Sequence, residues 1–226
     1  MRGNSEWISI SDMMAGLMMV FLFIAVVFMQ QVNKDKNALI EIAETYKHSI
    51  ILLNQALHDE FDDDLAEWGA EILDDNTIMF KEPDVLFEKN KFSVRERFKK
   101  ILDDFFPRYV EILSSDKFIN DIIELRVEGH TSTVGPPGST EQESYLYNAN
   151  LSQQRAFSVV DYVFTLGESR IHQEWLIKVL RANGLAFAKL IYDEGIENKA
   201  RSRRVEFRVI TNTEERIEKI LERSQE

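Results

Sequence analysis

The strongest pattern in the chain is an apolar run from Met13 to Met29 that contains no charged residue. A run of this length without a charge is typical of a helix that spans a membrane. Arg2 is the only basic residue before it, and no small-x-small cleavage site precedes Gln30. A signal peptide is therefore disfavoured. We predict a short tail at 1–7 and a transmembrane helix at 8–30.

After this run, apolar residues recur at alternating intervals of four and three. They are Leu39, Ala43, Tyr46, Ile50, Leu53 and Leu57. This heptad spacing predicts a helical linker over 31–75 that pairs with a copy of itself in a homodimer. The alternative is a helix that packs on its own domain. The acidic stretch 59–64 lacks the glycine and terminal glutamate of a calcium loop, so we interpret it as a solvated face.

The pattern then alternates between strands and helices. We predict strands at 77–80, 85–87, 122–128 and 205–210, and helices at 94–113, with a kink or break at Pro107, and at 148–165. The segment 175–182 fits either a strand or a helix, and the loop 129–138 contains two prolines. This order predicts an α+β domain over 76–213, with helices on one face of a small mixed sheet. A charged helix or tail follows at 214–226.

Composition excludes several classes of function. The formal charge of −12 argues against direct binding of nucleic acid. The chain has no cysteine, which excludes thiol catalysis, disulfides and zinc–cysteine sites. The four histidines, at positions 48, 58, 130 and 172, show no metal-ligand spacing. We therefore expect no metal site, no cofactor and no enzymatic activity in this chain alone.

Asp12 lies at the start of the apolar run and allows three interpretations. It could cap the N-terminus of a helix that begins at the membrane surface, or it could lie just outside the hydrocarbon. It could instead lie inside the span, where a carboxylate costs about 2.5–3.5 kcal/mol on insertion scales. Carboxylates inside a membrane usually face a protein partner or an ion path, so this third interpretation is a functional one.

Three motifs in order along the second half of the chain resemble the OmpA-like peptidoglycan-binding domain. They are Val127 to Thr131 (V-E-G-H-T), Tyr147 to Ala156 (Y-N-A-N-L-S-Q-Q-R-A) and Arg203 to Phe207 (R-R-V-E-F). The resemblance implies a site for the diaminopimelate of a cell-wall peptide. In that site Arg155 would bind the diaminopimelate carboxylate. The other positions that the resemblance places there are Thr131, Ser132, Tyr147, Asn148, Leu151 and Ser152.

The physical chemistry of these residue types agrees with an anion site. A planar guanidinium binds a carboxylate through two parallel hydrogen bonds. A loop beside a helix N-terminus also offers free N–H donors to an anion. The alternative is that Arg155 pairs with a local acid, Glu141 or Glu143.

One position departs from the family pattern. The aspartate that meets the diaminopimelate ammonium in the family is replaced here by Ser132. A serine hydroxyl supplies no countercharge. Binding is then weaker, or Glu141 or Glu143 approaches the ammonium instead.

The N-terminal segment resembles the MotB stator family. Trp7 and Asp12 match its W-x-x-x-x-D-x-M signature, which is followed by a Met/Leu/Phe-rich span. The resemblance implies that Asp12 carries H⁺ or Na⁺ and that two copies of the chain work inside a pentameric ring of MotA-like membrane subunits. It also implies an inner-membrane protein with a cytoplasmic N-terminus and a periplasmic wall-binding domain, although the flanking charges weakly favour the opposite orientation.

Within this family three functions compete. They are the ZorB-like branch of Zorya antiphage defence, with a ZorA-like ring partner, the flagellar motor stator, and a passive OmpA- or Pal-type cell-wall tether. A passive tether leaves Asp12 unexplained. The short tail at 1–7, the lack of an amphipathic plug after Met29, the opening at Trp7 and the serine at position 132 favour the ZorB-like branch over the flagellar one.

Overall fold

The computed structural model describes residues 3–81, 86–88, 91–167 and 170–212, except for the side chains of 3–10, 41–43 and 45–48. Two compact units result. One comprises Met1–Lys47 with Thr213–Glu226, and the other comprises His48–Asn212. The tail predicted at 214–226 and the strand residue predicted at position 85 lie outside the described residues.

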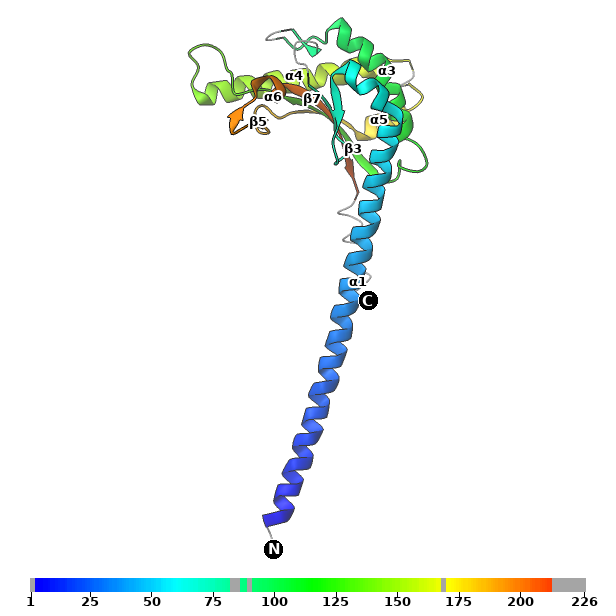
Figure 1. Cartoon of the computed structure of the whole chain (residues 1–226), viewed down its shortest axis with the longest axis vertical. Coiled ribbons are helices and arrows are strands. Elements are labelled where there is room, and N and C mark those ends of the chain that lie inside the picture. Colours follow the sequence, from blue (N-terminus) through cyan, green and yellow to red (C-terminus); the bar gives the residue numbers. More distant parts are fainter. Residues whose placement is uncertain (1–2, 82–85, 89–90, 168–169, 213–226) are drawn as a thin grey trace. The chain divides into compact units, whose positions relative to one another are not determined.

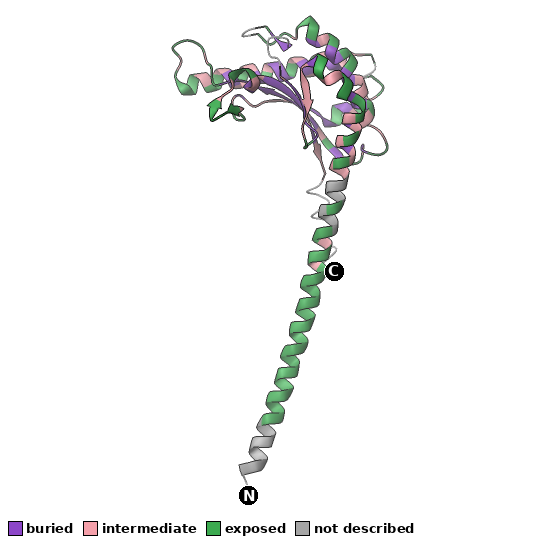
Figure 2. Ribbon diagram, in the orientation of Figure 1, coloured by how far each residue is buried: buried purple, intermediate pink, exposed green. Residues whose placement is uncertain are grey.

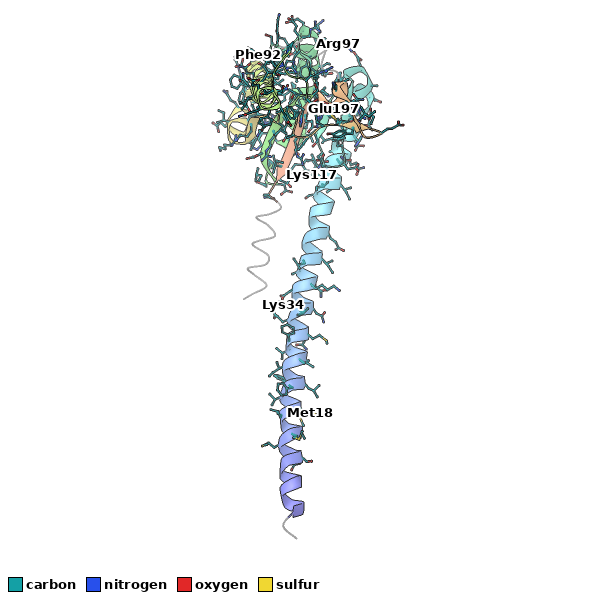
Figure 3. The ribbon with its side chains drawn as sticks, turned by 90° about the vertical axis from the view of Figure 1, so that its left-hand side faces the viewer. Met18, Lys34, Phe92, Arg97, Lys117 and Glu197 are labelled. Carbon is teal, nitrogen blue, oxygen red and sulfur yellow. The ribbon has the colours of Figure 1, made fainter. Side chains whose placement is uncertain are left out.

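Among the described residues, the first unit consists of the N-terminal part of helix α1, which spans Gly3–Trp68. Its stretch Ser11–Ile40 is 30 residues long and contains an 18-residue window with a mean hydropathy of 2.3, none of which is buried. By length and composition, this stretch can cross a membrane. Figure 2 shows the same stretch as almost wholly exposed, and in Figure 3 the side chains of Met18 and Lys34 project from a bare helix.

The second unit contains a five-stranded sheet in the order β1-β2-β7-β3-β4. The strands are β1 (Ala70–Ile72), β2 (Ile78–Phe80), β3 (Ile122–His130), β4 (Leu180–Gly184) and β7 (Arg204–Thr211). The β3–β4 pair is parallel and the other pairs are antiparallel. The mixed sheet predicted from the sequence is therefore confirmed. A separate hairpin joins β5 (Tyr192–Asp193) to β6 (Ile196–Glu197).

The helices of this unit are α3 (Glu96–Leu113), α4 (Glu141–Thr165), α5 (Gln173–Val179) and α6 (Lys199–Ser202). Helix α4 begins seven residues before the predicted start at 148. The reason is a capping box in which the Thr140 hydroxyl accepts from the Glu143 N–H and the Glu143 carboxylate accepts from the Thr140 N–H. The ambiguous segment 175–182 is helix α5 followed directly by strand β4.

The helices cover one face of the sheet, as predicted (Figure 1). The ring of Phe105 on α3 lies 5.1 Å from that of Phe207 on β7 and 5.2 Å from that of Phe80 on β2. Phe207 is the register partner of Val127 on β3, so both point to the same face. The core between helices and sheet is built from such alternate residues. The intervening residues of β3 and β7 point to the opposite face.

Helix α3 continues through Pro107, so of the predicted kink or break, the break is wrong and the kink stays a prediction. Proline removes one backbone hydrogen bond and crowds the preceding turn. Here Phe105, Phe106 and Tyr109 are completely buried on either side of the proline. Burial of three aromatic side chains outweighs the cost of the missing hydrogen bond.

The C-terminal end of α1 belongs to the domain core. Leu53, Leu57 and Phe61 are buried in the same cluster as Phe105, and the compact unit begins at His48. Leu53 and Leu57 therefore cannot form a seam with a second copy of the chain, and for these two residues the pairing prediction is wrong. The domain also includes the last part of the predicted 31–75 linker.

The acidic stretch 59–64 is only partly a solvated face. Arg108 on α3 donates from Nε to Glu60 Oε1 at 2.6 Å and from Nη1 to Asp64 Oδ2 at 2.9 Å. Partial burial alone would lower the pKa of Arg108, but hydrogen bonds to Glu60, Asp64 and Asp104 outweigh it and raise that pKa. These bonds join the end of α1 to α3.

Candidate functional site

Most of the residues predicted to form the site come together where the loop after β3 meets helix α4. The Thr131 N–H donates to the Ala186 carbonyl at 2.8 Å, and the Ala186 N–H donates to Ser152 Oγ at 3.0 Å. Asn148 Nδ2 donates to the Val134 carbonyl at 3.1 Å. The loop is thereby fixed against one face of α4. Thr131, Ser132, Asn148 and Ser152 are all buried there, and Tyr147 and Leu151 are half-buried.

Two glycines permit this close approach of helix and sheet. A Cβ on Gly129 would lie 2.3 Å from the Ser152 carbonyl oxygen, and one on Gly184 would lie 2.3 Å from the Gln153 nitrogen. Both neighbours are backbone atoms that cannot move aside without shifting the helix. The glycine of the Gly-His-Thr motif therefore sets the position of the helix that bears Arg155.

Arg155 is only 7% exposed, and two neighbouring residues hold its guanidinium in place. Its Nε donates to the Lys91 carbonyl at 3.0 Å, and the group lies 5.0 Å from the centre of the Phe87 ring. Burial lowers the pKa of Arg155 to about 10, so the group stays charged at neutral pH.

No carboxylate within the described ranges forms an ion pair with Arg155. The alternative pairing with Glu141 or Glu143 is thus not found. Glu143 instead binds Thr140, and these hydrogen bonds lower the pKa of Glu143. A buried cation without a countercharge favours an anionic ligand, because the ligand removes the cost of desolvation.

The loop residue beside Ser132 contacts a carboxylate that the sequence did not single out. The Thr133 N–H and hydroxyl donate to the two oxygens of Glu197 at 3.0 and 2.5 Å. Glu197 lies on β6 and is labelled in Figure 3. The hairpin that carries it is two residues per strand, which is too short to give a periodic signal. An acid does approach the loop, but it is neither Glu141 nor Glu143.

Asp12 lies inside helix α1, nine residues after the start of the helix at Gly3. It therefore does not cap the helix N-terminus, which removes one of the three interpretations. Asp12 lies in the Ser11–Ile40 stretch that is apolar enough to cross a membrane, and its side chain is exposed.

No protein-family model matches the chain. Zorya protein ZorB from Escherichia coli (Crooks strain) is 42% identical over 224 residues, which cover 98% of this chain and 94% of that protein. The chain belongs to the ZorB family. A second ZorB, from an Escherichia coli ETEC strain, is 28% identical over 209 residues, which cover 90% of this chain and 79% of that protein.

Solved structures give a more distant likeness. A protein from Desulfovibrio vulgaris described as MotB-like has a TM-score of 0.48 and 18% identity, and the match covers 76% of this chain and 98% of that one. The cell wall anchor of the T6SS from Pseudomonas aeruginosa has a TM-score of 0.45 and 24% identity, with 69% and 97% covered. The family assignment comes from the sequence relatives alone.

Proposed function

We propose that this chain is the wall-anchored membrane subunit of an ion-driven, stator-like motor in antiphage defence. The observation that carries the proposal is the 42% identity to a Zorya ZorB along almost the whole length of both proteins. Two features of the chain agree with it. One is the carboxylate of Asp12 in a membrane-spanning stretch, and the other is the uncompensated cation of Arg155 in the compact domain.

Asp12 is the proposed ion carrier. H⁺ or Na⁺ binds its carboxylate and leaves on the other side of the membrane, and each charge that crosses releases about 2.3 kcal/mol per 100 mV. A ring of MotA-like (ZorA-like) subunits supplies the rest of the ion path. The N-terminus is cytoplasmic and the domain from His48 is periplasmic, because peptidoglycan lies outside the inner membrane.

Arg155 is the proposed anchor to the wall. Its Nε is taken by Lys91, and no hydrogen-bond acceptor among the described residues takes its two terminal nitrogens. Those nitrogens are therefore available to the carboxylate of diaminopimelate in peptidoglycan. Asn148 and Ser152 keep the loop and helix in place around it, and Thr131, Ser132, Tyr147 and Leu151 complete the site.

Disrupting the gene at its native locus tests the assignment to defence. We expect phage to plate more efficiently on the disrupted strain, while swimming in soft agar stays unchanged. Restoring the gene on a plasmid should restore protection. A loss of swimming with unchanged phage sensitivity would instead assign the chain to the flagellar motor.

Pairing of two copies is proposed for the part of α1 that precedes the domain. Leu39 is 47% exposed, and Leu53 and Leu57 are excluded because they lie in the core. We expect single cysteines placed from 36 to 50 to cross-link in membranes with a period near 3.5 residues. Leu39→Asp should reduce cross-linking between two copies, because it places like charges in the seam.

The matched control for pairing is Asn37→Asp, which adds the same charge at an exposed position off the seam. Equal loss of cross-linking in both variants would show that charge alone, and not seam contact, is responsible. Cross-linking with no helical period would contradict pairing through this helix.

A further inference from the structure

A cluster of buried charged side chains lies on the face of the sheet opposite the helices. Glu128 and His130 alternate along β3, and Glu206 on β7 is the register partner of Glu128. Gly129, between the first two, faces α4, so the cluster points the other way. Two carboxylates directly opposite each other in an antiparallel pair repel unless a cation lies between them.

The three side chains converge closely and are almost completely buried. His130 is 0% exposed, and the side chains of Glu128 and Glu206 are 3% and 6% exposed. One ligand atom from each lies within 4.8 Å of the other two. Imidazole and carboxylate groups together are the ligands that Zn²⁺ takes in proteins.

The orientation of His130 is the second observation. Its Nε2 lies 3.3 Å from Glu206 Oε2 and 3.7 Å from Glu128 Oε2, yet it forms a hydrogen bond with neither. Its Nδ1 also has no hydrogen-bond partner among the described residues. Tetrahedral ligands about 2.05 Å from a zinc ion lie about 3.3 Å from one another. The 3.3 Å separation from Glu206 Oε2 matches that of two ligands around one ion, and the 3.7 Å separation from Glu128 Oε2 is somewhat longer.

Two basic residues lie at the edges of the cluster and contribute to its charge. Arg204 Nε donates to Glu206 Oε1 at 2.5 Å, which leaves Oε2 directed at His130. Lys189 Nζ lies 3.5 Å from Glu128 Oε2, but its side chain is 48% exposed. Arg204 is fixed by further bonds to the carbonyls of Lys189 and Ser202. Lys189 can swing into solvent, so its ammonium competes with a metal ion without blocking it.

We propose that Glu128, His130 and Glu206 form a binding site for one divalent transition-metal ion, with Zn²⁺ as the best fit, and that Lys189 is its competitor. A water molecule would fill the fourth position. No metal motif is visible along the chain, because Glu206 lies 76 residues after His130 and reaches it only through the pairing of β3 with β7.

The test uses the full-length chain in detergent, freed of metal and carrying an affinity tag without histidine. His48, His58 and His172 are replaced by Ala in every variant, because His58 and Asp62 lie 2.6 Å apart at the surface and could hold zinc weakly. Titration with ZnCl₂ against a chelating dye should give one zinc ion per chain. X-ray absorption should show one imidazole nitrogen in a shell of oxygen ligands.

Two variants decide the outcome. His130→Gln should weaken zinc binding at least about tenfold, and Lys189→Ala should tighten it about tenfold. Lys199→Ala, on an exposed residue of α6, is the matched control and should change nothing. The site is refuted if His130→Gln binds zinc as the parent does. It is also refuted if Lys189→Ala binds no tighter than the Lys199→Ala control, a result that does not depend on the stability of the histidine variant.

Discussion

Replacing Asp12 by Asn is expected to abolish protection against phage while leaving expression and membrane insertion unchanged. Asparagine keeps the size and the hydrogen-bonding groups of aspartate but cannot alternate between charged and neutral states. Inserting asparagine into the membrane also costs less free energy than inserting a carboxylate, so the variant helix should still span the membrane. The measurement is the efficiency of plating on cells that carry the variant together with its ring partner, with membrane fractionation to verify insertion.

Asp35→Asn is the control for the loss of one negative charge on the same helix. Asp35 lies in the polar segment that follows the predicted span, and its Oδ1 accepts a hydrogen bond from Gln31 Nε2 at 3.1 Å. We expect this variant to protect as well as the parent chain. Full protection by Asp12→Asn would remove the ion-carrier role.

Replacing Arg155 by Ala is expected to weaken binding of the chain to purified sacculi by about 10- to 100-fold. Loss of one charge-assisted bidentate contact costs about 1.5–3 kcal/mol. Adding Asn148→Ala should nearly remove binding, because Asn148 also holds the loop at Val134. Ser132→Asp should strengthen binding, because it restores a countercharge for the ammonium of diaminopimelate. Co-sedimentation with sacculi measures all three.

Arg201→Ala is the control for the loss of a surface arginine. Arg201 pairs with Asp193 at 3.2 Å and its side chain is 43% exposed, so its removal should leave sedimentation unchanged. Thermal unfolding of each variant separates a lost contact from a lost fold. Unchanged sedimentation of a folded Arg155→Ala would place the wall contact elsewhere.

The strands at 122–130 and 204–211 could be predicted because each alternates over many residues. The β5–β6 hairpin could not, because strands of two residues carry no measurable period. The site at Arg155 was predicted from motif resemblance. The contacts of Arg155 with Lys91 and Phe87, and of Thr133 with Glu197, were not predicted. They join segments that are distant in sequence and depend on tertiary packing.

The heptad spacing through Leu53 and Leu57 shows a different limit. A period of 3.5 residues says that one side of a helix is buried, but not what buries it. Here the hydrophobic core of the same chain buries these two positions. The prediction that the acidic stretch 59–64 is a solvated face was only partly right for a related reason. Its partner Arg108 lies more than forty residues away in the sequence.

If Arg155 anchors the chain to the wall, its uncompensated charge also affects how stable the protein is before it binds peptidoglycan. A buried cation with no countercharge subtracts from the stability of the folded domain, and a bound carboxylate restores that loss. The domain should then melt at a higher temperature once attached than before. Chains that never find peptidoglycan would be the ones that proteases remove first, so that attachment itself would select which copies persist.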